Sequence, residues 1–242
     1  ADEEVVNGHY LYFLLTSKLY YQLLRGFSSG SAQSQLPIKN VLELPIILPS
    51  IQEQQKIVEV LGALDEKIEL NRRINKTLDS LAQAVFKKWF IDDADPNWKT
   101  GKIGDISEEV LRGFTTSYVE KSNLINLNQK VNRGEYLDES NFKYYADDTI
   151  VPKNKFAKRG DILINSLGQG TLGRVHFYLE DTDNVVVDQH ITIIRTGAAK
   201  LKPEYLYYYL TNCCDLESLI TGSTGMLMLN ISHIRNFEIQ IP

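Results

Sequence analysis

Few residues of this chain have the types and spacing that enzymes use for chemistry. The two cysteines, Cys213 and Cys214, are adjacent, and the four histidines lack the spacing of metal ligands. The sequence also contains neither a phosphate-binding P-loop nor the G-x-S-x-G motif of a serine nucleophile. Asp188 and His190 could do acid–base chemistry, but a strand there would place both on one face with no evident nucleophile. We therefore expect no catalytic residue, no metal and no cofactor, and favour a structural or recognition role for this pair.

A glycine-rich hexapeptide, GQGTLG at residues 168–173, matches the pattern G-x-G-x-x-G of dinucleotide-binding loops. That function requires a helix to begin at the loop, whereas the residues that follow, RVHFY, predict a strand. We therefore interpret the hexapeptide as the turn of a hairpin. Its glycines would let the backbone approach a ligand closely, with Ser166, Gln169, Thr171 and Arg174 around it. A plain tight turn is the alternative.

Positive charge is concentrated in the segment that contains this turn. The whole chain of 242 residues has a net charge of -5, which argues against a generally basic coat protein for nucleic acid. Residues 151–175 nevertheless hold only one anion, Asp161, against five cations: Lys153, Lys155, Lys158, Arg159 and Arg174. A local basic face is sufficient for binding at a DNA groove, whatever the net charge.

One long helix is predicted over residues 50–92. Ser50 and Glu53 form an S-x-x-E capping box at its start, and the sequence DDADPNW ends it. Its apolar residues recur at alternating steps of four and three, which is the seam of a coiled coil. The seam consists of Ile57, Leu61, Leu64, Ile68, Asn71, Asn75, Leu78, Ala82, Val85 and Trp89. The two asparagines would fix register and orientation, and the partner helix must come from another chain or another part of the protein.

Two parts of the chain resemble each other in sequence. YLYFLLT at 10–16 matches YLYYYLT at 205–211, and each is followed by a helical stretch and a small-residue turn, SSGS or GSTG. Each copy then ends in an alternating apolar strand that stops at Pro49 or Pro242, so the offset falls from 195 to 193 residues. We interpret this pattern as a duplication, with residues 1–49 as the tail of a first domain.

The remaining residues, 93–242, predict short strands joined by turns. Strands are expected at 160–167, 173–179 and 184–195, and a helix is expected at 203–220. The fold class is therefore α+β, with a mainly antiparallel sheet or partial barrel and few helices. No apolar run is long enough to span a bilayer and no secretory signal is present, so we expect a cytosolic protein.

Several of these motifs together resemble the specificity subunit of type I restriction–modification systems. The motifs are LPIILPSIQEQQKIVEVLGALDEKIELN at 44–71, WKTGKIGDI at 98–106, KNKFAKRGDILINSLGQGTLG at 153–173 and VVVDQHITIIR at 185–195. The resemblance covers essentially the whole chain and also includes both copies of the repeat. It departs from the family pattern because most of a first domain and a second long helix are missing.

The resemblance implies a protein that recognises DNA and does no chemistry itself. In that family two target-recognition domains each read half of a split DNA target, and two antiparallel helices separate them and help to dock methyltransferase subunits, which restriction subunits join. Here residues 1–49 would be the end of a first recognition domain, 50–92 the spacer helix and 93–242 the second recognition domain. Two such chains could pair their helices as a homodimer.

The candidate DNA-contacting residues follow from charge and position, because the recognition loops of the family vary. Cations hold phosphates, and amide or guanidinium groups read base edges. The candidates are Lys130, Arg133, Lys153, Lys155, Lys158, Arg159, Ser166, Gln169, Thr171, Arg174 and Gln189. Surface solubility is the alternative for each lysine, and a coiled-coil scaffold that does not bind DNA is the alternative for the whole chain.

Overall fold

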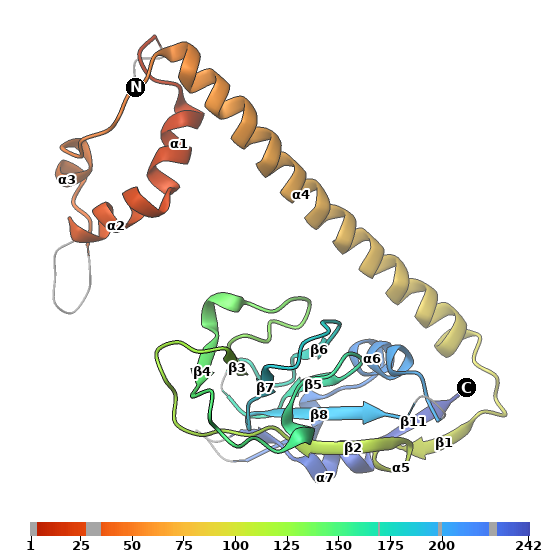
Figure 1. Ribbon diagram of the computed structural model, residues 1–242. Helices are drawn as coiled ribbons and strands as arrows, with labels where there is room; N and C mark the ends of the chain where they lie inside the picture. The colour runs from red at the N-terminus through yellow and green to blue at the C-terminus, as the bar shows by residue number, and fades with distance from the viewer. Residues whose placement is uncertain (1–3, 28–34, 169, 198–199, 223–226) are drawn as a thin grey trace. The chain divides into compact units, whose positions relative to one another are not determined.

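The computed structural model describes residues 4–27, 35–168, 170–197, 200–222 and 227–242 (Figure 1). The chain forms two compact units, Ala1–Ser80 and Leu81–Pro242. No helix in the described ranges is long and apolar enough to cross a membrane.

The first unit is helical in its described part. Its elements are α1 (Gly8–Thr16), α2 (Lys18–Gly26), α3 (Ile38–Leu42) and the greater part of α4 (Ile51–Lys87). The Asn7 side chain caps α1 by accepting from the His9 and Tyr10 amides. The amide group of Gln54, which is fully buried, accepts from Asn7 N and donates to the backbone oxygens of Val5 and Pro49. These bonds tie the start of α4 to the chain that precedes α1.

The capping box at the start of α4 forms as the sequence predicts. The Ser50 amide donates to the Glu53 carboxylate at 2.9 Å, and the Glu53 amide donates to Ser50 Oγ at 3.4 Å. The helix continues through a π-helical turn, η1 (Lys88–Asp92), so the prediction of one helix that ends at residue 92 is confirmed.

All the strands among the described residues lie in the second unit. They are β1 (Lys99–Lys102), β2 (Ser107–Arg112), β3 (Leu124–Leu127), β4 (Lys143–Tyr145), β5 (Ile162–Asn165), β6 (Val175–Phe177), β7 (Val185–Val187), β8 (Ile191–Thr196), β9 (Ile220–Thr221), β10 (Met228–Leu229) and β11 (Glu238–Ile241). The helical elements besides η1 are α5 (Ile103–Ile106), η2 (Glu139–Asn141), η3 (Lys153–Lys155), α6 (Pro203–Asn212), η4 (Glu217–Leu219) and α7 (Ile231–Asn236).

The strands form four small sheets. The largest has the order β2-β8-β5-β6 and is antiparallel throughout, and a three-stranded sheet has the order β4-β3-β7, in which β3 and β7 run parallel. Two further pairs, β1 with β11 and β9 with β10, are antiparallel. The α+β class with mainly antiparallel pairing is therefore confirmed.

The four-stranded sheet is covered on both faces, which explains its continuous apolar sequences. Leu163 and Ile193 pack with Leu127 and Val187 of the three-stranded sheet in one core cluster. Their neighbours Ile162, Ile164 and Ile194 face the other cluster, which also contains residues of α5, α6, α7 and β11. Since every residue of β5 is buried, the strand reads as an unbroken apolar run rather than an alternating one.

The duplication is visible in matching hydrogen bonds. Tyr10 OH donates to Ile47 O at 2.9 Å, and Tyr205 OH donates to Gln240 O at the same distance. These are the residue pairs that the 195- and 193-residue offsets bring into correspondence. The same offset of 193 places Ile38, at the start of α3, on Ile231, at the start of α7. The two copies therefore share an α1/α6 helix, an α3/α7 helix and the bond between tyrosine and terminal segment.

Three of the predicted elements differ from the structure. The segment 44–49 forms no strand in the first copy, although its counterpart forms β11. The predicted helix at 203–220 ends at Asn212, so both cysteines follow it, and a 3-10 turn and β9 come after them from Glu217. The predicted strand at 184–195 divides into β7 and β8. The small-residue turns at 28–31 and 222–225 lie, except for Gly222, outside the described residues.

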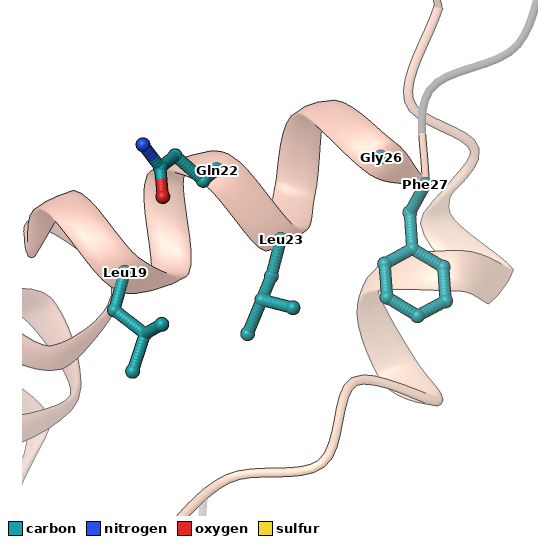
Figure 2. Close-up of a pocket in the computed structure, with 5 residues that line it drawn as sticks. All are labelled: Leu19, Gln22, Leu23, Gly26 and Phe27. Carbon is teal, nitrogen blue, oxygen red and sulfur yellow. The ribbon is translucent and has the colours of Figure 1, made fainter.

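The first unit also carries a cavity of about 310 Å³ beside α2. Leu19, Gln22, Leu23, Gly26 and Phe27 line it, and Figure 2 shows the three apolar side chains on one side of the helix. Leu19 is 60% exposed, so the cavity is an open apolar surface rather than an enclosed core.

Candidate nucleic-acid interface

Three loops of the second unit meet at one end of the sheets. The Asn165 side chain, at the end of β5, donates to Gln129 O at 3.0 Å in the loop after β3. The amides of Ser166 and Leu167 both donate to His190 O, in the turn between β7 and β8. We call residues 128–134, 166–168, 170–174 and 188–190 the three-loop surface.

The glycine-rich loop is the turn of a hairpin, as the sequence predicts. It joins β5 to β6, which pair antiparallel, so no helix begins there and the dinucleotide-binding interpretation does not apply. Gly168 has a φ of 113°, and a Cβ at this position would lie 2.9 Å from Thr171 Oγ1 and 3.1 Å from Gln129 Cγ. Glycine is therefore required both by the backbone and by the close approach of the neighbouring loop. Gln169 lies outside the described residues.

Several candidate residues do come together on the three-loop surface. Lys130 and Gln189 are exposed, and Thr171 is half-buried with its hydroxyl donating to Gly168 O. Arg174 donates to Gly170 O at 3.1 Å and to Asn132 O at 3.4 Å, while Arg133 forms an ion pair with Asp138 at 3.0 Å. The side chains of Lys130 and Gln189 make no hydrogen bond or ion pair among the described residues, whereas both arginines already hold loop segments together.

Ser166 does not have the ligand-facing position that we expected. It is fully buried, and its hydroxyl lies 2.7 Å from Thr192 Oγ1 and 3.1 Å from Ile164 O. Because Ser166 directly follows the buried strand β5, its side chain continues the core instead of lining the loop. Its role is to hold the hairpin against β8.

Two of the remaining cations, Lys158 and Arg159, do not extend the three-loop surface. Lys158 and Arg159 precede β5 and therefore lie at the opposite end of that strand, where Arg159 pairs with Asp181 at 3.6 Å. Lys155, in η3, donates its ammonium to Arg112 O at 2.7 Å, and burial lowers the pKa of Lys155. Lys153 is exposed in the same 3-10 turn. The basic segment is therefore several separate sites rather than one continuous face.

A buried ion-pair network accounts for the single anion of this segment. Arg195 on β8 donates to both oxygens of Asp161, at 2.8 and 2.9 Å, and to Glu109 at 2.6 Å. Burial alone would lower the pKa of Arg195, but the bonds to the two carboxylates outweigh it and raise the pKa. Arg195 also donates to the backbone oxygens of Asn154 and Phe156, so it anchors η3 to the sheet. No local sequence pattern indicates this network, because its charged members lie 34 and 86 residues from Arg195.

Asp188, the buried first residue of the 188–190 turn, forms a second buried polar centre. Its carboxylate is fully buried and accepts from Asn126 Nδ2 at 3.2 Å and from Thr115 Oγ1 and Tyr118 OH at 3.3 Å. It also accepts from the His190 amide at 2.9 Å and contacts His190 Nδ1. Asp188 and His190 thus lie in a turn, not on one face of a strand as we had assumed, and their structural role positions the exposed Gln189 between them.

Tyrosines extend this polar centre toward the surface. Tyr145 OH accepts from Asn126 Nδ2 at 2.6 Å and donates to Phe114 O at 3.0 Å, and burial raises the pKa of Tyr145 to about 12. The Tyr118 ring stacks on Tyr145 and carries the Lys143 ammonium 4.2 Å above its centroid. Sequence spacing did not single out these residues, because they approach Asp188 from distant parts of the chain.

The repeated helix and its tyrosine bond to the terminal segment, together with this loop-bearing domain, agree with a known protein family. The model of the type I restriction modification DNA specificity domain matches residues 2–80 and 96–242. The chain belongs to this family. Each of the two matched segments contains one copy of the repeat, and the interruption between them contains the end of the long helix region.

Two curated relatives of the family are similar to this chain in sequence. The specificity subunit of type I restriction enzyme MjaIX from Methanocaldococcus jannaschii is 26% identical over 98% of this chain and 59% of its own length. The specificity subunit of HindI from Haemophilus influenzae is 38% identical over 38% of this chain and 20% of its own length. The chain therefore spans less than two thirds of the length of either relative.

A solved relative has the same fold. It is the S subunit of a type I restriction–modification system from M. genitalium, which aligns with 99% of this chain and 62% of its own chain at a TM-score of 0.52 and 16% identity. At this identity the similarity supports the α+β architecture and the long helix, and not the position of any DNA-contacting residue.

Proposed function

We propose that this chain is a sequence-reading part of a type I restriction–modification complex and that its second unit reads one half of a bipartite DNA target. Membership of the DNA specificity domain family carries the proposal. On this proposal the chain is non-catalytic, acts in the cytoplasm and leaves DNA modification and cleavage to methyltransferase and restriction subunits that dock on it.

The three-loop surface offers the groups that such reading needs. Lys130 is an exposed cation suited to a phosphate, and Gln189 is an exposed amide suited to a base edge. The buried Asp188 carboxylate and its donors hold the turn that carries Gln189. Because this turn is already ordered, DNA binding would cost less conformational entropy. We propose Lys130, Thr171, Arg174 and Gln189 as the contacts, with Arg133 supporting the loop.

The long helix supplies the proposed spacer between two reading domains. Its seam is uncovered within the described structure: Leu64 is 54% exposed, Ile68 49% and Leu78 57%. An antiparallel partner helix would bury these residues and allow Asn71 and Asn75 to form hydrogen bonds across the seam. The partner is a second copy of this chain or another segment of the same protein, and residues 1–49, 50–92 and 93–242 would then act as domain end, spacer and recognition domain.

The test uses the chain mixed with its methyltransferase subunits. The duplex that this mixture prefers is selected from random sequences, and the bases that the bound proteins protect are then mapped by footprinting. Gln189→Ala should reduce discrimination between the preferred duplex and a scrambled one, because each good base contact contributes about 1–3 kcal/mol. Gln55→Ala is the matched control, since Gln55 is an exposed glutamine on α4, far along the chain from the three loops.

Two outcomes would count against the proposal. If no duplex is bound even with the methyltransferase subunits present, the chain acts as a coiled-coil scaffold instead. If a preferred duplex is bound and protected but Gln189→Ala and Gln55→Ala discriminate equally well, the chain reads DNA through a surface other than the three loops.

A further inference from the structure

The repeat provides a template for a strand pairing that the described residues of the first unit do not make. In the second copy, β11 pairs antiparallel with β1, in the register Gly101 opposite Ile239 and Lys99 opposite Ile241. Figure 1 shows the two arrows side by side. The 193-residue offset places Ile46 on Ile239 and Leu48 on Ile241, yet residues 45–48 pair with no strand in the described structure.

The backbone of the first copy is oriented for the same pairing. Ile47 O accepts from Tyr10 OH, and Ile47 N donates to Tyr20 OH at 3.2 Å, so the polar groups of Ile47 face the helices. Backbone groups alternate in direction along an extended strand, which turns those of Ile46 and Leu48 the opposite way. The N–H groups of Ile46 and Leu48 have no hydrogen-bond partner among the residues that the structure describes.

The exposed fractions of the side chains also indicate that a neighbouring strand is missing from the described part of the first copy. Ile239 is 1% exposed: its strand pairs with β1, and it belongs to the core cluster that includes residues of α5 and α7. Its counterpart Ile46 is 37% exposed, and its neighbours Ile47 and Leu48 are 68% and 43% exposed. These three residues have exposed apolar side chains, and the backbone N–H groups of Ile46 and Leu48 lack hydrogen-bond partners among the described residues. Both features are typical of a strand edge to which another strand can be added.

We propose that residues 45–48 form a docking edge for an extended polypeptide segment with the sequence pattern of β1. The segment would run antiparallel to residues 45–48 and place a glycine opposite Ile46. The glycine follows the template, in which a Cβ at Gly101 would lie 2.5 Å from the end of the Ile241 side chain, whose counterpart here is Leu48. Main-chain hydrogen bonds to Ile46 and Leu48 would supply the affinity, and burial of Ile46 would complete the core of the first unit. The proposal does not depend on DNA binding.

A labelled peptide of residues 97–107, NWKTGKIGDIS, tests the edge on the full chain by fluorescence anisotropy. We expect saturable binding that Ile46→Asp weakens at least about tenfold, because a charge would replace the apolar contact. Ile38→Asp is the matched control, since Ile38 is 78% exposed in the same unit and lies outside the edge. Far-ultraviolet circular dichroism confirms that both variants keep their helices.

A pair of modified peptides makes the test independent of variant folding. An N-methyl group at the Gly101 position should abolish binding, whereas one at Thr100, whose amide faces away, should leave it unchanged. A photo-cross-linker in the peptide should label residues 44–49. The proposal is overturned if the unmodified peptide does not bind, if the two N-methyl peptides bind equally, if Ile38→Asp weakens binding as much as Ile46→Asp, or if cross-links form only at 237–242.

Discussion

At the scale of single residues, buried polar groups organise the second unit. Asp188 and Arg195 are both buried, and each joins segments that are far apart in the chain. Asp188 accepts from Asn126, 62 residues away, and Arg195 donates to Glu109, 86 residues away. Since an unpaired buried charge is very unfavourable, each network requires all its members and thereby specifies how the loops are placed.

The Arg195 network gives a prediction about stability. Asp161→Ala should lower the free energy of unfolding of the second unit by about 3–5 kcal/mol, because it leaves a buried guanidinium without its main partner. Urea denaturation followed by near-ultraviolet circular dichroism measures this change. Asp181→Ala is the control: it breaks the exposed pair with Arg159, in which the aspartate side chain is 81% exposed, and should change the stability by less than about 1 kcal/mol. Equal effects of the two variants would contradict the structural role of Asp161.

His176 gives a prediction about pH. Its Nδ1 lies 2.7 Å from Gly134 O and must carry the proton, because a carbonyl only accepts. Its Nε2 is buried without a partner among the described residues, and burial lowers the pKa of His176. The unfolded chain therefore binds the second proton more readily, so the stability contribution is complete above the unfolded pKa of about 6.5 and is lost as pH falls toward the folded pKa.

The measurement is the free energy of unfolding of the second unit at about pH 7.5 and about pH 5.5. His176→Gln should reduce the loss between these two values, since glutamine can still donate to Gly134 O but does not titrate. His9→Gln, which changes an exposed histidine, should leave the loss as it is in the unmodified chain. An unchanged pH dependence in His176→Gln would show that other groups cause it.

At the scale of elements, the long helix was predictable and its surroundings were not. The capping box and the end at residue 92 followed from the sequence because these signals lie within one turn of the residues they affect. The segment 44–49 was expected to be a strand from its alternating pattern. It is not one, because a strand also needs a neighbour, and no local pattern supplies that neighbour.

The seam of α4 gives a prediction about assembly. Asn71→Leu with Asn75→Leu should change the solution mass or the relative orientation of the paired helices, because leucine removes the only polar positions that select one register. Sedimentation equilibrium and distances between spin labels measure mass and orientation. Arg72→Leu with Lys76→Leu adds the same two side chains outside the seam and should alter neither. Unchanged mass and orientation in the asparagine variant would argue against a paired seam.

At the scale of the whole molecule, the acidic chain must bind DNA, on our proposal, through a small local surface. Few phosphate contacts imply a moderate but measurable salt dependence of binding to random duplexes. We expect Lys130→Ala to weaken binding to all sequences about equally and to reduce the slope of log affinity against log salt by about 1. Lys39→Ala removes a cation that is 81% exposed in the first unit and should leave the slope unchanged. Equal slopes for both variants would show that Lys130 does not contact a DNA phosphate.

The sequence by itself determined the features that depend on neighbours along the chain. It predicted the capped helix, its seam, the hairpin at GQGTLG, the repeat and, through the repeat and its motifs, the family. Only the tertiary structure decided which polar residues reach the surface. It buried Ser166 and placed Lys158 and Arg159 at the opposite end of β5 from Arg174. It also built the Asp188 centre from residues 62 to 73 positions away, for which no periodicity or spacing gives a signal. Local patterns report on backbone conformation, whereas burial and charge pairing depend on contacts between distant segments.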